Sequence, residues 1–305
     1  MPIPHKYLPN TSYLPYLAIA LVGLVWGSNF IFMKLAASHI NPMQIVLVRV
    51  LFGFLPIALF AASQKVLKFS DLKHVPHFIV MGLLATVIYY FGFAKGTSLL
   101  SSGIAGAISG AIPLFTLCTA LFALKEEKVT LGKLCGAMLG FIGVVVLARP
   151  FNAQLASATG AIYMVLGSIS VGVSFVYAKR FITPLKLSAL ALTTYQLGAG
   201  LIILCFTTDF EGIGNIANDT NVLLTTFIGL GLFGTGIAYL CYYFIIEKLG
   251  ALVASSVTYI PPVVALAIGA VIVGENIEVR DYAATGLILL AVTIISISNK
   301  REAAR

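Results

Sequence analysis

Long stretches without a charged residue are the feature that most constrains this chain. A bilayer core about 30 Å thick needs roughly 20 apolar residues to be crossed by a helix. Six stretches have at least 20 residues: Leu14–Met33, Gly96–Leu124, Leu155–Ala178, Leu187–Thr208, Thr220–Ile246 and Leu249–Gly274. Four more lie between or after them: Met43–Ala62, interrupted only by Arg49, then Phe78–Ala94, Leu134–Ala148 and Tyr282–Asn299. The sequence therefore predicts ten transmembrane segments.

These segments are continuous apolar runs and not alternating patterns, which favours helices over a transmembrane barrel. Hydrophobic residues make up 59% of the chain and charged residues 10%. Ordinary soluble domains carry roughly a quarter charged residues. The predicted fold class is therefore an all-α integral membrane protein, and a soluble fold is excluded.

The cations are distributed unevenly between the two sides of the predicted membrane. If the N-terminus is cytoplasmic, fourteen Lys and Arg residues fall on the cytoplasmic side and only Lys34, Lys95, Arg149 and Arg280 on the other. The longest outer connection, Asp209 to Asn221, contains three acidic residues and no cation. The positive-inside rule then predicts that both termini are cytoplasmic.

Several other partners and chemistries leave patterns that this sequence lacks. The net charge is +8, but the cations lie between spans and form no basic stripe with aromatic residues, so no nucleic acid is expected. The four cysteines lie inside apolar runs without CxxC spacing, so we expect no metal site, disulfide framework or cofactor. A membrane enzyme needs an acid and base pair, an activated nucleophile or metal ligands at membrane depth, and no such set is present, so no catalytic residue is predicted.

The chain contains an internal repeat that two sequence offsets reveal. At an offset of 145 residues, five positions match: Gly27, Phe30, Phe32, Lys34 and Gly53 with Gly172, Phe175, Tyr177, Lys179 and Gly198. At an offset of 149 residues, seven positions match: Gly82, Thr86, Tyr90, Phe93, Ala105, Pro113 and Glu126 with Gly231, Thr235, Tyr239, Tyr242, Ala254, Pro262 and Glu275.

Each half holds five predicted spans. Because five is odd, the second half enters the membrane from the opposite side and is inverted relative to the first. Two inverted five-helix repeats are a transporter architecture with a binding site near the midplane. The predicted organisation is a cytoplasmic tail at 1–13, a first repeat at 14–149, a linker at 150–156, a second repeat at 157–299 and a cytoplasmic tail at 300–305.

The segment from Trp26 to Lys34, WGSNFIFMK, resembles the first-helix signature of EamA-type transporters of the drug/metabolite transporter superfamily. The resemblance continues at Pro113-Leu114-Phe115 through Glu126, and at Pro262 through Gly274-Glu275 and Gly286. It implies ten helices, cytoplasmic termini and the movement of small solutes such as amino acids, nucleotide-sugar-like metabolites or drugs, commonly as export. It identifies the scaffold and not the cargo. The first half departs from the pattern, because it reads Lys125-Glu126-Glu127 where the second half has the more typical Gly274-Glu275.

Small and weakly polar residues form matching stripes on two predicted helices. The stripes are Ser102, Gly106, Ser109 and Pro113, and at equivalent places Ala251, Ser255, Thr258 and Pro262. Close helix packing explains each residue separately, whereas the pair also fits two walls of a cavity. We therefore take Ser109 and Thr258 as candidate substrate contacts. Pro113 and Pro262 are candidate hinge or gating positions, because a proline leaves a backbone carbonyl free.

Tyr90 and Tyr239 occupy equivalent places in the two halves, and rings with hydroxyl tips suit an amphipathic solute. An aromatic belt at the membrane surface is the alternative, and it fits residues near helix ends better than these deeper ones. Trp26 and Asn29 share a face of the first helix, and Ser174 is the equivalent of Asn29. A buried amide needs a partner, which either a substrate or a neighbouring helix supplies. All five are candidate substrate contacts.

Arg49 is the only charge well inside an apolar run. Its charge suits an anionic substrate group. The interpretation we favour is that its guanidinium snorkels to the outer surface, because Arg49 lies only about 9 Å along the helix from Met43. Glu126 and Glu275 lie at span ends, where a charge costs little, and we expect them to have gating or anchoring roles.

Together these patterns predict a secondary transporter that moves a small amino-acid-like or otherwise amphipathic metabolite by alternating access, with export as the favoured direction. A passive channel or a membrane assembly protein without transport activity stays open as an alternative, and a membrane enzyme has less support. The expected partners are a small-molecule substrate and the lipid bilayer, and the sequence leaves monomer and homo-oligomer both open.

Overall fold

The computed structural model describes residues 13–123, 130–148, 155–249 and 255–303, and all regular secondary structure within them is helical. By length and composition, seven helical stretches can cross a membrane: Leu14–Ala36, Pro42–Ser63, Phe69–Leu99, Ser102–Ala123, Ala158–Leu185, Ala189–Thr207 and Thr220–Tyr242. Two shorter apolar helices span Leu131–Leu147 and Val257–Val273. An all-helical membrane protein is therefore confirmed, whereas the number ten stays a prediction.

The first half contains seven α-helices and two other helical segments within its described residues. They are α1 (Leu14–Ala36), α2 (Pro42–Ser63), the 3₁₀ segment η1 (Phe69–His74), α3 (Val75–Gly82), the π-helix η2 (Leu83–Ile88), α4 (Tyr89–Leu99), α5 (Ser102–Ser109), α6 (Ile112–Ala123) and α7 (Leu131–Ala148). The predicted run Gly96–Leu124 is thus divided, because Gly110 and Ala111 form a turn between α5 and α6.

The second half has a similar order of elements. They are α8 (Leu155–Tyr177), η3 (Ala178–Ile182), η4 (Thr183–Leu185), α9 (Ala189–Thr207), η5 (Ile213–Asn218), α10 (Thr220–Leu224), the π-helix η6 (Thr225–Ile237), α11 (Ala238–Leu249), η7 (Ser255–Tyr259), α13 (Ile260–Ala267), the π-helix η8 (Ile268–Val273) and α14 (Val279–Ala303). The predicted tail at 1–13 and the linker at 150–156 fall mostly outside the described residues, whereas most of the predicted tail at 300–305 is the end of α14.

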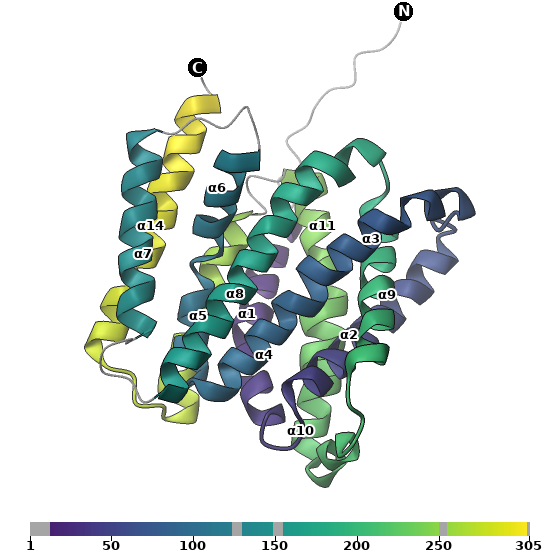
Figure 1. Cartoon of the computed structure of the whole chain (residues 1–305), viewed down its shortest axis with the longest axis horizontal. Coiled ribbons are helices and arrows are strands. Elements are labelled where there is room, and N and C mark those ends of the chain that lie inside the picture. The colour runs from purple at the N-terminus through teal and green to yellow at the C-terminus, as the bar shows by residue number, and fades with distance from the viewer. Residues whose placement is uncertain (1–12, 124–129, 149–154, 250–254, 304–305) are drawn as a thin grey trace, which may run out of the picture.

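Contacts between the two halves come in pairs that the two sequence offsets relate. Helix α1 packs against η6, α11 and α13, and its equivalent α8 packs against η2, α4 and α6. Helix α2 packs against η6, and its equivalent α9 packs against η2. Helices α7 and α14, which are equivalent to each other, lie side by side at one edge of the molecule (Figure 1).

Glycines bring α2 and η6 into close contact. A Cβ atom built at Gly53 would lie 2.6 Å from Thr235 Cβ, and one at Gly231 would lie 2.6 Å from Phe52 Cβ. In membranes, where lipid is as apolar as the helices, such small residues promote association by allowing close backbone approach. The missing side chains therefore set the distance between α2 and η6.

Glycines also allow close packing of α7 against α14. A Cβ at Gly132 would overlap Ser298, one at Gly136 would lie 2.7 Å from Ile295 Cγ1, and one at Gly143 would lie 2.7 Å from Ile288 Cγ1. The rising residue numbers on α7 meet falling numbers on α14, so the two helices are antiparallel.

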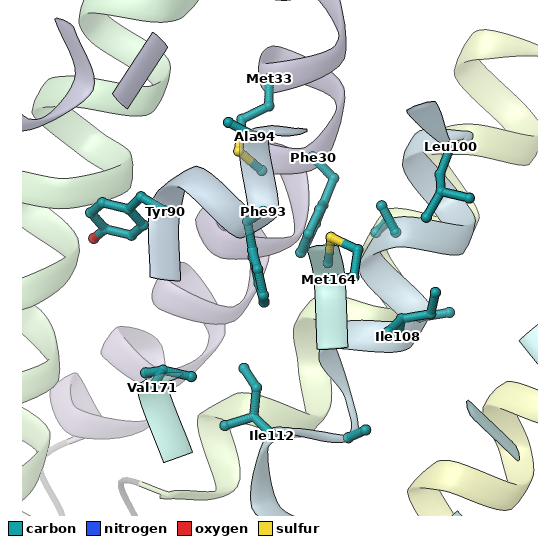
Figure 2. Packing of buried hydrophobic residues seen from close by; sticks show 14 of the residues in the cluster. Phe30, Met33, Tyr90, Phe93, Ala94, Leu100, Ile108, Ile112, Met164 and Val171 are labelled. Atoms are coloured by element: carbon teal, nitrogen blue, oxygen red, sulfur yellow. The ribbon is translucent and has the colours of Figure 1, made fainter. Parts of the chain in front are cut away.

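The main apolar core lies between the halves. Figure 2 shows Phe30, Phe93 and Met164 grouped together, with the Tyr90 hydroxyl directed away from them. The rings of Phe30 and Phe93 have centroids 5.8 Å apart, and all four side chains are buried. Tyr90 belongs to this core and also contacts a cluster of polar side chains.

The close approach of α2 to η6 yields a stability prediction. Gly53→Ala should lower the free energy of unfolding by about 1–3 kcal/mol, because the new methyl group overpacks the contact with Thr235. The measurement is the detergent melting temperature of the purified protein.

Gly286→Ala in α14 is the matched control, because a Cβ there would meet no atom within 4 Å. This substitution should leave the melting temperature unchanged or raise it slightly, since Ala favours a helix by up to about 1 kcal/mol over Gly. Equal melting temperatures for the two variants would contradict the close contact at Gly53.

Candidate functional site

Arg49 lies at the centre of a buried polar cluster between the two halves. It is the eighth residue of α2, about 10 Å along the helix from Pro42. Its side chain is only 4% exposed. The favoured interpretation that Arg49 snorkels to the surface was therefore wrong. The guanidinium turns inward, because neighbouring helices offer it oxygen, sulfur and aromatic partners.

The partners of Arg49 come from α1 and η6. Nε donates to Thr235 Oγ1 at 3.0 Å, Nη2 donates to the Gly234 carbonyl at 3.5 Å, and Nη1 approaches Met33 Sδ at 3.8 Å. With the amide of Asn29 assigned so that its oxygen faces Arg49, Oδ1 accepts from Nη2 at 3.1 Å. In this assignment, Asn29 Nδ2 donates to the Val25 carbonyl at 3.1 Å.

Tyrosines complete the cluster. The Arg49 guanidinium carbon lies 3.8 Å from the centroid of the Tyr90 ring, which is a cation–π contact. The Tyr90 hydroxyl donates to the Tyr239 hydroxyl at 3.5 Å. The two tyrosines matched by the 149-residue offset therefore meet each other across the interface between the halves.

The π-helices explain why polar groups gather here. A π-helix displaces backbone carbonyls from the regular α pattern, and within a membrane these need other partners. Thr235 in η6 donates to the Leu230 carbonyl at 3.0 Å while its oxygen accepts from Arg49. In η2, the Leu84 carbonyl accepts from the Ser170 hydroxyl at 2.7 Å.

The equivalent place in the other half is neutral. Thr86 in η2, the match of Thr235, accepts a hydrogen bond from Gln196 Nε2 at 3.4 Å. The offset of 145 residues places Thr194 at the position of Arg49, and Thr194 donates to the Leu190 carbonyl of its own helix at 2.8 Å. The cluster therefore carries its positive charge in one half only.

No carboxylate among the described residues forms an ion pair with Arg49. The oxygen partners of its guanidinium are an amide, a hydroxyl and a backbone carbonyl, which are all neutral. A charge in this position is costly, because transfer out of water removes its hydration. The neutral partners stabilise it only in part.

Three of the predicted substrate contacts, Asn29, Tyr90 and Tyr239, meet at Arg49 or next to it. Trp26 lies one turn before Asn29 on α1 and packs against Tyr242, with ring centroids 5.6 Å apart. This contact belongs to a separate apolar cluster formed by α1, α11 and η7.

The other predicted contacts have local partners. Ser109 donates to the Gly106 carbonyl at 2.6 Å, and Ser174 donates to the Val171 carbonyl at 2.7 Å, each within one helix. Thr258 is half-buried in η7. The hydroxyls of Ser109 and Ser174 therefore have acceptors within their own helices, and a role in substrate binding stays a prediction for these two residues and for Thr258.

The candidate hinge prolines follow breaks in the helices. Pro113 lies in the first turn of α6, directly after the turn that separates α6 from α5. Pro262 lies in the first turn of α13, where a 3₁₀ segment changes to an α-helix. Glu126 falls outside the described residues.

Glu275 connects the end of η8 to the start of α5. Its Oε1 accepts from the Ser102 backbone N–H at 2.6 Å and from the Ser102 hydroxyl at 2.8 Å, and its Oε2 accepts from the Gly103 N–H at 2.9 Å. A carboxylate at a helix N-terminus is favoured by the unpaired N–H groups and the helix dipole. Gly274 makes the turn possible, because its φ of 70° suits glycine.

Lys34 makes a complementary contact close by. Its Nζ donates to the carbonyls of Leu100 at 2.6 Å and Ser98 at 3.2 Å, near the C-terminus of α4. A cation there is favoured by the free carbonyls of the helix end. Lys34 and Glu275 therefore fasten α1, α4, α5 and the end of η8 together on one side of the molecule.

Sequence reasoning missed Arg49 as the centre of the site, and it missed Met33 and Gly234 as its neighbours. One signal was present, since Arg49 is the only charge inside an apolar run. Its depth along α2 did not indicate its direction, because the direction depends on which helices pack around it.

Comparisons with known proteins agree with this architecture. The profile of the EamA-like transporter family matches residues 14–149 and again residues 158–297. An uncharacterized transporter from Archaeoglobus fulgidus is 27% identical over 92% of this chain and 98% of its own length. The uncharacterized inner membrane transporter YedA from Escherichia coli K12 is 26% identical over 92% of this chain and 90% of its own length.

A further relative and a solved structure extend this finding. The uncharacterized transporter YdfC from Bacillus subtilis is 26% identical over 84% of this chain and 81% of its own length. One crystal structure is similar with a TM-score of 0.64 and 18% identity, and the match covers 94% of this chain and 98% of the other. This likeness shows a shared fold.

The contact between Glu275 and α5 yields a second prediction. Glu275→Ala should lower the free energy of unfolding by about 1–3 kcal/mol, because the N–H groups of Ser102 and Gly103 lose their acceptor. The control is Glu278→Ala, which removes an exposed ion pair with Arg280 at 2.8 Å and should cost less than about 1 kcal/mol. Equal losses in the detergent melting temperature would contradict the anchoring role of Glu275.

Proposed function

Because this chain belongs to the EamA-like transporter family, we propose that it is a secondary transporter that exports a small amphipathic metabolite across the bacterial inner membrane by alternating access. The observation that carries the proposal is the buried polar cluster of Arg49, Asn29, Tyr90, Tyr239 and Thr235, which both halves build together. Such a cluster between repeats, in a chain otherwise apolar, is where a transporter binds its solute.

The proposed architecture is ten transmembrane helices in two inverted repeats at 14–149 and 157–299. The paired contacts between the halves support it, since α1 meets α13 as α8 meets α6. A two-fold axis in the membrane plane produces such pairs. The two halves then form near-equivalent gates on the two sides of one central site, which is the basis of alternating access.

In this proposal Tyr90, Tyr239 and Asn29 contact the solute, and Trp26, Ser109, Ser174 and Thr258 extend the cavity. Pro113 and Pro262 act as hinges, since each follows a break in its helix. Glu275 acts in the outer gate, because its carboxylate joins α5 to the end of η8. Glu126 is the matching candidate for the inner gate. The protein is not an enzyme, and its partners are the solute and the lipid bilayer.

A metabolite panel tests transport directly. Proteoliposomes with purified protein are loaded with the panel, and the solutes that leave are identified by mass spectrometry. Counterflow, in which an unlabelled internal solute drives uptake of its labelled form, distinguishes a carrier from a passive channel. If proteoliposomes release no panel solute faster than liposomes that carry the same panel but no protein, the proposed function is contradicted.

The proposed orientation has both termini in the cytoplasm. In a variant without the four native cysteines, Lys68→Cys should resist an impermeant thiol reagent added to intact cells, whereas Asn215→Cys should react. Permeabilised cells provide the control, because both cysteines should then be labelled. Labelling of the cysteine at position 68 from outside would overturn the orientation.

Tyr239 provides a test of the proposed cavity. Tyr239→Phe removes one hydroxyl, so the loss of a hydrogen bond to the solute should weaken transport affinity by about 0.5–1.5 kcal/mol, or several-fold. Tyr282→Phe removes a hydroxyl from an exposed tyrosine of α14 and serves as the matched control. With melting temperatures at the wild-type value, an unchanged affinity in Tyr239→Phe would exclude Tyr239 as a solute contact.

A further inference from the structure

We propose that Arg49 binds a carboxylate of the transported solute, so that the substrate is a small amphipathic molecule with a single carboxylate group. This inference rests on the proposed transport function and identifies the substrate class. It begins from the charge of Arg49, which is buried to 4% exposure and pairs with no carboxylate among the described residues.

The free energy of a buried guanidinium depends on what surrounds it. Charged residues in membrane segments usually face a partner of opposite charge or a water-filled space. The surroundings of Arg49 in α1, α4 and η6 are Asn29, Met33, Tyr90, Gly234 and Thr235, which carry no charge. An anionic solute supplies the missing negative charge, and the protein and solute together become neutral at this position.

The hydrogen bonds of Arg49 leave Nη1 without an oxygen acceptor. A guanidinium has five N–H groups. Nε and Nη2 reach oxygen atoms, but the partner found for Nη1 is Met33 Sδ at 3.8 Å. A thioether is a weak acceptor. A carboxylate that replaces Met33 at Nη1 gains a charge-assisted hydrogen bond, and the fork of Arg suits both of its oxygens.

The single positive charge indicates which anion fits. One carboxylate neutralises Arg49, whereas a dianionic phosphate would leave a net negative charge in the same buried place. Among the described residues, no second Lys or Arg contacts Arg49, Asn29 or Tyr90, and the position equivalent to Arg49 is occupied by the neutral Thr194. The balance of charge therefore favours a monocarboxylate group.

The surroundings of the cluster indicate the rest of the solute. The Tyr90 ring packs on Arg49 and belongs to the same apolar core as Phe30, Phe93 and Met164, which Figure 2 shows. Beyond Tyr90, the hydroxyl of Tyr239 offers a hydrogen bond. A solute anchored at Arg49 thus meets aromatic and aliphatic side chains, which suits an apolar body next to the carboxylate.

Access to Arg49 requires helix movement, because the guanidinium is almost fully buried. The π-helix η6 supplies Gly234 and Thr235 to the cluster, and the π-helix η2 ends directly before α4, which carries Tyr90. Such π-helical segments are common at functional sites. A shift of η6 along α2 separates Thr235 from Arg49 and frees the Nε–H. The same shift moves the Gly234 carbonyl away from Nη2, so that the carboxylate binds at Nη1 and Nη2.

The first measurement is binding to the purified protein in detergent. The probes come in pairs, and the two members of a pair differ by the exchange of a carboxylate for a carboxamide. The pairs are 3-phenyllactate with 3-phenyllactamide, and 3-phenylpropionate with 3-phenylpropionamide, in which a neutral amide replaces the carboxylate. A ligand that binds the folded protein raises its melting temperature with concentration. We expect the carboxylates to raise it and the amides to leave it unchanged. Equal shifts within each pair, or no shift with either carboxylate, would overturn the proposal.

Variants of Arg49 assign the effect to this residue. Arg49→Gln should abolish the shift with carboxylates, and Arg49→Lys should weaken the affinity about tenfold or more, because Lys keeps the charge and loses the fork. Arg280→Gln, which changes an exposed arginine of α14, is the control and should behave as wild type. If Arg49→Gln does not fold, Arg49→Lys and the wild-type comparison of acids with amides still decide the outcome.

Transport of the same probes in proteoliposomes separates this inference from the proposed function. Counterflow of carboxylates but not amides by the wild-type protein supports both. Transport of the amides at the same rate keeps the proposed function and overturns the carboxylate site. Carboxylate binding without transport of these probes or of any panel solute supports the site and contradicts the transporter.

Discussion

A positive charge held out of water between two halves of the chain is the constraint on which the central architecture depends. The Arg49 guanidinium stays there because α2 and η6 approach closely enough for Nε to reach the Thr235 hydroxyl at 3.0 Å. That approach needs Gly53, where a Cβ would lie 2.6 Å from Thr235 Cβ. Gly53 thus allows α2 to approach η6, and Arg49, one turn earlier in α2, reaches Thr235 in the second half of the chain.

The two halves are alike in backbone and unlike in charge. The offset that places Tyr90 on Tyr239 also places Thr86 on Thr235, and both threonines accept hydrogen bonds from helix α2 or α9. The donor is Arg49 in one case and Gln196 in the other. The close similarity of the scaffold supports equivalent movements of the halves, whereas the single charge gives the central site one polar end. If the proposed site binds an asymmetric solute, its single charge favours one orientation of that solute.

The sequence predicts helices well, because a long apolar run in lipid has few alternatives to a helix. It also matches Tyr90 with Tyr239, and the structure places their hydroxyls 3.5 Å apart, whereas their contact with a solute stays a prediction. The prediction that the Arg49 side chain extends to the surface was wrong, because the depth of a residue along its helix does not show which helices pack around it. Ser109 and Ser174 show another limit, since a hydroxyl in a helix finds an acceptor one turn back without any solute. The turn at Gly110 and Ala111 divides a run that the sequence predicts as continuous, and it lies directly before Pro113, which the sequence marks as a hinge or gating position.

The π-helices link backbone geometry to the charge. Thr235 donates to the Leu230 carbonyl, five residues earlier, and accepts from Arg49 with the same oxygen. A return of η6 to α-helical geometry would change which residue lies one turn before Thr235, and it would rotate this hydroxyl relative to α2. The Arg49 guanidinium would then lose its closest oxygen acceptor while remaining between the halves. A buried cation in that state binds an anion more strongly than in the present one, because neutral oxygens no longer compete for its N–H groups. The backbone state of η6 and the affinity of Arg49 for an anion are therefore coupled through a single hydroxyl group.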